Sequence, residues 1–309
     1  MVLAWIPMEA QPTNSRARIR HLSPRNVLQM AFCEFRRYTG VVMASKVATR
    51  KGNARLIDVD AASFETLPCC GIKNLTHPGR QQKGCWLREN AQFGLRAKVL
   101  LLPDGQPGGY IEYVPVGFAW RGVDAAGYMF IHCIWIYSRN QHRGWGGFLV
   151  RACLEDAQEA GMSGAAVMVR EGPLMAGRRL FLKHGFKVVD TAPPDCELLA
   201  NRFDGSAPLP AFKKDWGQKL RQYSRGLTII RSSQCPYFAK YAADIAEAAK
   251  NEYHIKPTVI ELKSWRDAQR APTPYAVFSV IHNGQVLADR QISGARFRNI
   301  MYKLRMECR

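Results

Sequence analysis

The chain has 309 residues, enough for two compact domains, and its 47% hydrophobic and 22% charged residues are typical of a globular protein. No apolar run approaches the roughly 18 to 20 residues that a membrane-spanning helix needs. Nine cysteines, irregularly spaced and not preceded by a recognisable secretory signal, favour reduced thiols in the cytoplasm over a disulfide framework. Because no pair of C-x-x-C motifs occurs, we expect no metal site.

The net charge of +19 is concentrated at the two ends of the chain. Residues 1–55 hold ten Lys and Arg against two acidic residues, and residues 209–309 hold eighteen against eight. Proteins that read nucleic acid place such charge on a recognition helix or among aromatic residues, and neither pattern occurs. We therefore expect no nucleic-acid partner, and basic ends are more typical of solubility or of long-range attraction of anionic ligands.

Residues 1–54 form a basic extension without a core-forming pattern. Three readings stay open: a disordered tail, a sequence start placed ahead of a true start at Met43, or an organellar transit peptide, which is also rich in Arg and poor in acids. The first two are favoured together, and we expect no chemistry in this segment.

From residue 55 to residue 205 strands and helices alternate, which predicts an α/β domain. The expected strands are Arg55–Val59, Leu95–Leu102, Tyr110–Trp120, Tyr128–Tyr137, Gly164–Val169 and Phe186–Asp190. The expected helices are Gln81–Phe93, Leu149–Ala160 and Met175–His184. Pro and Gly residues then mark a linker, assigned to residues 206–226.

Residues 227–309 predict a second, smaller domain. Its expected elements are a strand at Leu227–Arg231, a helix from Cys235 to Asn251, a strand at Thr258–Leu262, a helix at Ser264–Gln269, strands at Tyr275–Ile281 and Val286–Ile292, and a helix at Phe297–Arg305. Asn283-Gly284 is a strong signal for a two-residue hairpin turn between the last two strands.

A glycine-rich loop lies between the apolar strand that ends near Tyr137 and the helix that follows. Its residues are Gln141, His142, Arg143, Gly144, Trp145, Gly146 and Gly147. Backbone N–H groups at a helix N-terminus favour an anion, and glycines let the backbone approach a pyrophosphate. The loop lacks the Gly-Lys-Ser/Thr ending of a Walker loop and the glycine spacing of a dinucleotide fingerprint.

The Gln-x-Arg-Gly-x-Gly pattern of this loop resembles the acetyl-CoA loop of the GNAT superfamily. Downstream, the block Leu-Phe-Leu-Lys-His-Gly-Phe at residues 180–186 resembles a second recurrent block of that family. The resemblance covers about residues 55–203 and implies a mixed, splayed sheet that holds acetyl-CoA, with pantetheine paired to the backbone of Ile134, Trp135 and Ile136. It implies direct transfer of an acetyl group, within a ternary complex, to a small-molecule or peptide amine.

The chain departs from the family where many members carry a proton donor for the departing thiolate. Those places hold Leu174 and Phe181, neither of which can donate a proton. The usual acid is therefore missing, unless Tyr110, Tyr137 or a water molecule replaces it.

The general base that accepts the proton of the attacking amine has three candidates: Glu112, His132 and Glu171. His132 is equally well read as a hydrogen-bonded core residue, and Glu112 as a solvated carboxylate at a strand edge. Cys133 is most simply a small buried apolar residue.

The block Cys-Gly-Ile-Lys-Asn-Leu-Thr-His-Pro-Gly-Arg at residues 70–80, followed by Lys83 and Trp86, resembles one found in GNAT proteins that carry a C-terminal YoaP-like domain. Its place in the fold implies a position over the acceptor side of the cleft. An ordered loop packed by Trp86 is the alternative.

The second domain resembles the thioredoxin fold, and its details resemble glutaredoxins. Cys235-Pro236-Tyr237-Phe238 resembles Cys-Pro-Tyr-Cys without the second cysteine, and Thr273-Pro274 stands where that fold keeps a cis-proline. A thiol at a helix N-terminus with Lys240 nearby is expected to have a lowered pKa, which makes Cys235 a candidate reactive thiol. The competing function is a thiol-binding or redox adaptor whose GNAT half only senses CoA, and a degenerate domain that serves packing or substrate binding is the further alternative.

Overall fold

The computed structural model describes residues 53–307 except 61–62, 73 and 173–174. The chain divides into two units, residues 1–42 and 43–309, and every described residue belongs to the second. Almost all of the basic extension at residues 1–54, and Leu174 with it, lie outside the described residues.

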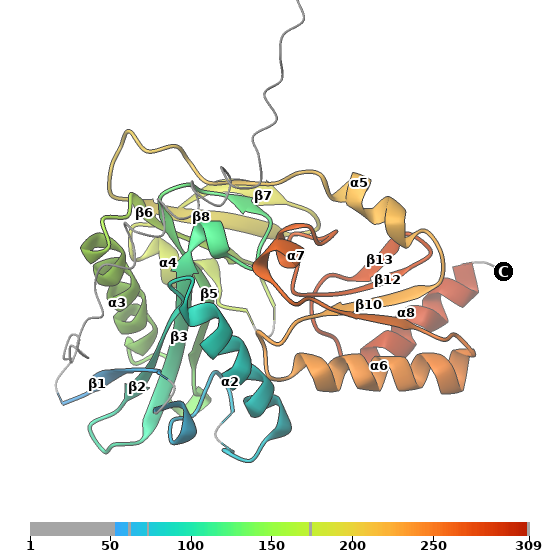
Figure 1. Cartoon of the computed structure of the whole chain (residues 1–309), viewed down its shortest axis with the longest axis horizontal. Helices are drawn as coiled ribbons and strands as arrows, with labels where there is room; N and C mark the ends of the chain where they lie inside the picture. Colours follow the sequence, from blue (N-terminus) through green and yellow to red (C-terminus); the bar gives the residue numbers. More distant parts are fainter. Residues whose placement is uncertain (1–52, 61–62, 73, 173–174, 308–309) are drawn as a thin grey trace, which may run out of the picture. The chain divides into compact units, whose positions relative to one another are not determined.

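A seven-stranded mixed sheet forms the first half of the described chain (Figure 1). Its strands are β1 (Arg55–Asp58), β2 (Arg96–Leu101), β3 (Pro107–Pro115), β5 (Tyr128–Ile136), β6 (Gly164–Val169), β7 (Lys187–Ala192) and β8 (Cys196–Arg202). The strand order is β1-β2-β3-β5-β6-β8-β7, and β5 and β6 form its parallel pair. A mixed sheet in this half was expected.

Strand β8 was not predicted. It inserts between β6 and β7, where Leu198 and Leu199 are both fully buried. The segment follows Pro193-Pro194-Asp195, and no strand was expected between Asp190 and the linker at residues 206–226.

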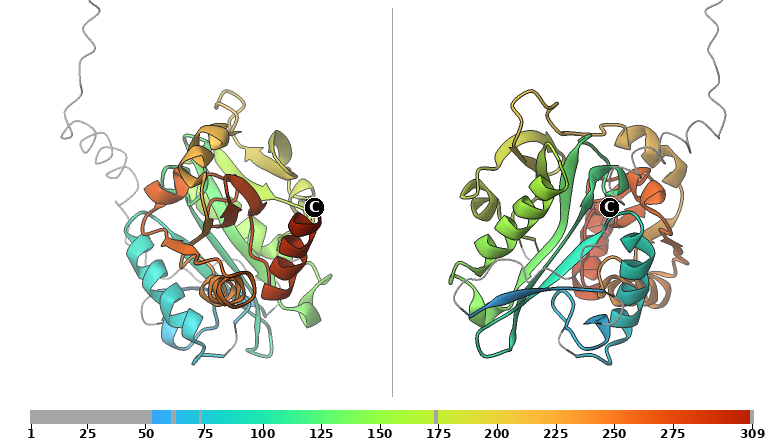
Figure 2. Two further views of the ribbon diagram at one scale, coloured as in Figure 1. Left: turned by 90° about the vertical axis from the view of Figure 1, so that its right-hand side faces the viewer. Right: turned by 60° about the vertical axis from the view of Figure 1, so that its left-hand side comes forward.

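Alternate residues along the central strands contribute side chains to two separate apolar clusters, because successive side chains of a strand point to opposite faces of the sheet. Ile111 and Ile131 lie in the cluster covered by helix α3 (Trp145–Glu159), and Tyr110 and Phe130 lie in the other. Helix α2 (Pro78–Ala91) contributes Trp86 to that second cluster. Figure 2 shows α2 and α3 on opposite faces of the sheet.

A second, four-stranded sheet has the order β11-β10-β12-β13. Strands β10 and β11 are parallel, and the other two pairs are antiparallel. The strands are β10 (Leu227–Arg231), β11 (Thr258–Glu261), β12 (Phe278–His282) and β13 (Gln285–Ala288), and the helices of this half are α6 (Phe238–Tyr253), α7 (Trp265–Gln269) and α8 (Gly294–Glu307). Asn283 and Gly284 have φ angles of 48° and 80°, as a two-residue hairpin turn requires.

The two sheets share one apolar cluster. It contains Trp86 and Phe130 of the first half together with Phe238 and Phe278 of the second. The segment assigned as a linker has structure of its own, because β9 (Ala211–Phe212) pairs with β4 (Val123–Asp124) and α5 (Trp216–Leu220) follows. The remaining helix of the first half is α4 (Arg178–Leu182). No helix of the described chain has both the length and the apolar sequence that crossing a membrane would need.

Candidate active site

The parallel pair β5–β6 separates halfway along its length. Their pairing runs only from Tyr128 opposite Gly164 to Ile131 opposite Val167. Beyond this point Ile134, Trp135 and Ile136 keep their pairing with β3 on the other side. The three residues expected to pair with pantetheine therefore lie on the β5 edge that faces away from β3, beyond the last β6 pair.

The glycine-rich loop leads from β5 into α3, and Gln141, His142, Arg143 and Gly144 are all exposed. Gly144 is the N-cap of α3 with φ at 78°, a conformation that favours glycine, and no side chain caps the helix there. The first turn of α3, which starts at Trp145, is thus oriented as an anion site requires.

Gly146 and Gly147 serve the packing of α3 on the segment around α4. A Cβ on Gly147 would come within 2.4 Å of His184 Nε2, and one on Gly146 would lie 3.2 Å from the Leu180 side chain. The missing side chain of Gly146 leaves room for Leu180, and its role in giving the backbone access to a pyrophosphate stays a prediction.

A cavity of about 90 Å³ opens where β5 and β6 separate. We call it the junction pocket, because both halves of the chain line it. Its lining includes Glu112, Arg121, His132, Cys133, Trp135, Met168 and Phe181 from the first half, Cys70 from the loop before α2, and Gln234, Cys235, Tyr237, Tyr275 and Gln291 from the second half.

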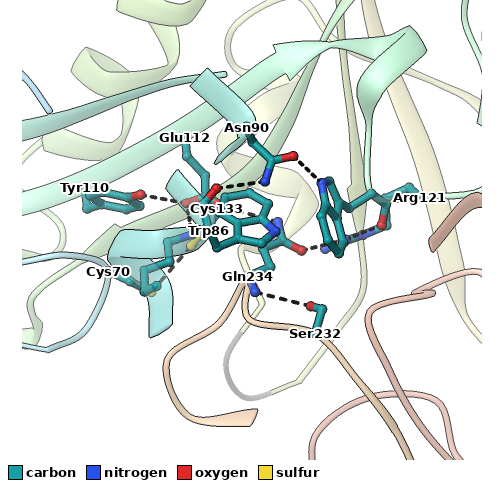
Figure 3. Close-up of polar contacts among 11 residues, drawn as sticks. Cys70, Trp86, Asn90, Tyr110, Glu112, Arg121, Cys133, Ser232 and Gln234 are labelled. Atoms are coloured by element: carbon teal, nitrogen blue, oxygen red, sulfur yellow. Dashed lines mark hydrogen bonds and ion pairs between the residues drawn. The ribbon is translucent and has the colours of Figure 1, made fainter. Parts of the chain in front are cut away.

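Glu112 lines this pocket and is fully buried. Its carboxylate forms an ion pair with Lys83 and accepts hydrogen bonds from Tyr110 Oη at 2.6 Å and from Gln234 Nε2 at 3.1 Å (Figure 3). Lys83 also lies over the Trp86 ring, 4.1 Å from its centroid. The reading of Glu112 as a solvated edge carboxylate was wrong, because α2 and the second half of the chain cover this face of β3.

His132 is the extra residue of a β-bulge in β5, since Glu112 pairs with Cys133 and Tyr113 with Ile131. Its Nε2 accepts the backbone N–H of Trp120 at 3.0 Å. Burial, followed by the positive charges of Arg121 and Lys83, holds the pKa of His132 well below its usual value. The ring is therefore neutral with its proton on Nδ1, and its one basic nitrogen already has a partner.

Two cysteines of the pocket form a contact that the sequence did not indicate. Cys70 Sγ lies 3.5 Å from Cys133 Sγ. This hydrogen bond lowers the pKa of Cys70 against the raising effect of burial, whereas the same bond and burial raise the pKa of Cys133. Of the two thiols, Cys70 is therefore the one that ionises more readily.

Cys235 behaves opposite to the expectation of a lowered pKa. It lines the junction pocket, and burial raises its pKa well above the usual value. Helix α6 starts only at Phe238, and the exposed Lys240 pairs with Asp244 at 2.6 Å. All seven cysteines in the described part of the chain are free thiols.

The expected cis-proline is also absent. The bond before Pro274 is not cis, and Pro193-Pro194 is the cis pair within the described ranges. A turn forms at Pro274 instead, closed by the N–H of Ala276 donating to the carbonyl of Thr273 at 3.1 Å.

The remaining predicted residues divide between the pocket and the surface. Phe181 is fully buried against Phe186 and lines the pocket, so the position of the usual acid is apolar. The hydroxyl of Tyr110 already donates to Glu112, and Tyr137 is buried at the end of β5. Glu171 is exposed. Among the described residues, no group of His, Cys, Asp and Glu is arranged to hold a metal ion.

Two pocket residues, and the partner of a third, were missed. Arg121 and Gln234 are buried and hydrogen-bonded to each other at 2.9 Å, and Lys83 pairs with Glu112. Neither Arg121 nor Gln234 belongs to a recognisable motif, and they meet only because the two halves of the chain pack together. Lys83 was noted within the block that precedes Trp86, but without a role.

Comparison with known proteins shows which family the first half of the described chain is similar to. Residues 65–186 match the model of the acetyltransferase (GNAT) family. The "Uncharacterized N-acetyltransferase YoaP" of Bacillus subtilis (strain 168) is 28% identical over 247 residues, which cover 76% of this chain and 93% of that protein.

Two solved structures show similarity to part of the chain. The acetyltransferase yncA from Salmonella typhimurium, solved with acetyl-CoA, is 16% identical with a TM-score of 0.40, covering 51% of this chain and 98% of its own. The GNAT family N-acetyltransferase YhbS from Escherichia coli, solved with CoA, is 14% identical with a TM-score of 0.35, covering 54% and 93%.

Proposed function

We propose that the chain is an N-acetyltransferase of the GNAT type, which transfers the acetyl group of acetyl-CoA directly to a small-molecule or peptide amine bound in the junction pocket. The observation that carries this proposal is the separation of β5 from β6 beside that pocket. Ile134 and Trp135 on one strand and Met168 on the other line both the separation and the pocket. A thioester in the separation would thus face an amine in the pocket.

The cofactor residues follow from the loop and the strand edge. The pyrophosphate would bind the N-terminus of α3, with Arg143 adding donors, and the backbone of residues 134–136 would pair with the amide groups of pantetheine. The exposed loop and the uncapped helix N-terminus support this placement.

Direct transfer requires a group that takes a proton from the attacking amine. Of the expected candidates, Glu112 lines the pocket with a carboxylate, whereas the basic nitrogen of His132 already accepts the N–H of Trp120. We therefore assign the base to Glu112, and the Nδ1–H of His132 becomes a hydrogen-bond donor toward the pocket. The amine attacks the thioester carbonyl, the C–S bond breaks, and CoA leaves as a thiolate that takes up a proton.

We propose that residues 227–309 form a thioredoxin-like domain that contributes to acceptor binding. The strand order β11-β10-β12-β13, with one parallel and two antiparallel pairs, supports that fold. Cys235 lies where the active thiol of that fold stands, but its raised pKa and its place in the junction pocket favour a binding role over thiol exchange. The proposed boundaries are residues 55–205 for the acetyltransferase domain and 227–309 for the second.

The cofactor site is tested by reversing one charge. In Arg143→Glu a carboxylate would face the pyrophosphate, so we expect CoA affinity measured by calorimetry to fall at least about tenfold. The melting temperature should stay within about one degree, because Arg143 is exposed.

The matched control is Arg88→Glu, which makes the same charge change at an exposed position of α2. It should leave CoA affinity unchanged. Equal CoA affinity in the wild type and Arg143→Glu would overturn the placement of the pyrophosphate at this loop.

A further inference from the structure

The guanidinium of Arg121 is buried in the wall of the junction pocket, and 3% of the residue is exposed. Its Nη1 donates to the carbonyl of Trp120 at 2.7 Å and to Gln234 Oε1 at 2.9 Å, and the group lies over the Tyr275 ring, 4.6 Å from the centroid. All three contacts are to uncharged groups. Within the described ranges Arg121 forms no ion pair.

The charges that line or adjoin the pocket do not cancel. Lys83 and Glu112 pair with each other, and His132 is neutral, so the charge of Arg121 remains. Burial lowers the pKa of Arg121, which reflects the cost of holding a charge away from water. Arg170, another buried arginine, instead pairs with Asp289 at 2.6 Å and with Asp195. A buried positive charge without a counter-ion, next to a cavity, is a site for an anion.

Other polar groups of the pocket also lack partners. His132 Nδ1, Trp135 Nε1 and Gln291 Oε1 are buried, line the pocket and have no hydrogen bond within the described part of the chain. The indole nitrogen is always a donor, and His132 Nδ1 carries the proton because Nε2 accepts from Trp120. Two free donors and one guanidinium thus surround a small cavity, a set of groups that suits a carboxylate.

We propose that the acetyl acceptor is a small amino-carboxylate, such as an amino acid, whose carboxylate pairs with Arg121. This inference rests on the proposed function and specifies its substrate class. Arg121 contacts Gln234 and Tyr275 of the second half, whereas Trp135 belongs to the β5 edge proposed for acetyl-CoA. The carboxylate therefore lies toward the second half and the amine toward the thioester. The proposed thioredoxin-like domain thereby helps to select the substrate.

Acceptor pairs that differ only in this group test the proposal. The common amino acids and their carboxamides would be incubated with acetyl-CoA, and release of the CoA thiol would be followed. We expect the best amino acid to exceed its carboxamide by about 100-fold or more in kcat/KM, since a buried unpaired charge rejects a neutral analogue. Arg121→Gln should lose that preference, because kcat/KM should fall far more for the amino acid than for its carboxamide.

The matched control is Arg266→Gln. Arg266 also lies over an aromatic ring, 4.2 Å from the centroid of Trp265, but it is exposed and outside the pocket. The control should keep the full preference. Transfer to amines without a preference for the carboxylate, or an equal loss for both members of a pair in Arg121→Gln, would overturn the inference while leaving the proposed function intact.

A binding measurement separates the two proposals. N-acetyl amino acids, added together with CoA, should raise the melting temperature of the wild type more than their carboxamides do, and this difference should vanish in Arg121→Gln. If it occurs while no amine is acetylated, the carboxylate site stands and the proposed transfer fails. If the melting temperature responds equally to both compounds, the carboxylate site fails.

Discussion

Cys70 and Cys235 line the same pocket, yet their thiols are tuned in opposite directions. Burial is the largest influence on the pKa of Cys235, and burial raises that pKa because it disfavours a thiolate. Cys70 is also buried, but its hydrogen bond with Cys133, with the two sulfur atoms 3.5 Å apart, lowers its pKa. The prediction of a lowered pKa for Cys235 considered only its position near a helix N-terminus. It was wrong because the packing of the second half against the first buries this thiol.

The first prediction at this scale concerns thiol reactivity. Among the cysteines of the junction pocket, Cys70 should react fastest with iodoacetamide at neutral pH, since the thiolate is the reactive form. Cys133→Ala should slow the reaction of Cys70 severalfold, because it removes the hydrogen bond that lowers the pKa of Cys70. Peptide mapping after timed labelling distinguishes Cys70 from the exposed Cys85, which provides an internal reference. Faster labelling of Cys235 than of Cys70 would contradict the assignment.

At the scale of elements, the strands and helices that follow a local pattern were predicted, and the others required tertiary contacts. Strands Gly164–Val169 and Leu227–Arg231 have the predicted bounds. Helix α3 starts at Trp145 and not at Leu149, because Gly146 and Gly147 argue against a helix until their packing on Leu180 and His184 is known.

The candidate site shows the same division. The glycine-rich loop could be read from a run of seven residues, whereas the contact between Glu112 and Gln234 joins positions 122 residues apart. No sequence pattern indicated Arg121. Its proposed role depends on its burial without a counter-ion, and that burial comes from the packing of the second half. Local motifs thus located the loop proposed to bind the cofactor, and only the folded chain identified the groups of the junction pocket.

Asp190 connects strand β7 to the segment that links the two halves. Its carboxylate accepts hydrogen bonds from the N–H of Phe212 and from Lys214 Nζ, both at 2.8 Å, and from the N–H of Thr191. Burial acts to raise the pKa of Asp190, but these donors outweigh it and hold the pKa below the usual value. A depressed pKa means that this stabilisation is present above about pH 4 and is lost as the pH falls through the folded-state pKa.

The prediction at the scale of elements follows from the lowered pKa of Asp190. Asp190→Asn should lower the free energy of unfolding by about 1 kcal/mol at pH 7, because charge-assisted hydrogen bonds become neutral ones. The difference from wild type should shrink as the pH falls below about 4, because the carboxyl of the unfolded wild type takes up its proton there and the folded one follows at lower pH. Urea unfolding at several pH values measures this. Asp104→Asn is the control, since Asp104 accepts a single N–H, from Gln106 at 3.0 Å, within an exposed turn. A deficit that stays constant from pH 7 to pH 3 would contradict the prediction.

At the scale of the whole described unit, the two sheets share a core and a set of buried polar bonds. One apolar cluster runs from Trp86 and Phe130 to Phe238 and Phe278. Gln269 of α7 donates to the carbonyls of Gly117 and Ala119 in the first half, at 3.2 Å and 3.1 Å. Separating the halves would expose this core and break these bonds, so the junction pocket depends on both halves being folded and packed together.

The last prediction is that residues 55–205 and 227–309 unfold together. Because the core is shared, urea unfolding followed by tryptophan fluorescence and by far-ultraviolet circular dichroism should give one transition with the same midpoint. Arg170→Met should lower the midpoint, because it lowers the free energy of unfolding by about 3 kcal/mol. The variant leaves the largely buried Asp289 without the ion-pair partner that it contacts at 2.6 Å. The double variant Arg170→Met/Asp289→Leu should recover much of the loss, because it removes the unpaired charge as well. Both probes should shift equally in each variant. Two separate transitions, with only the one from residues 227–309 affected by Arg170→Met, would mean that the halves fold independently and that the junction pocket forms only after they dock.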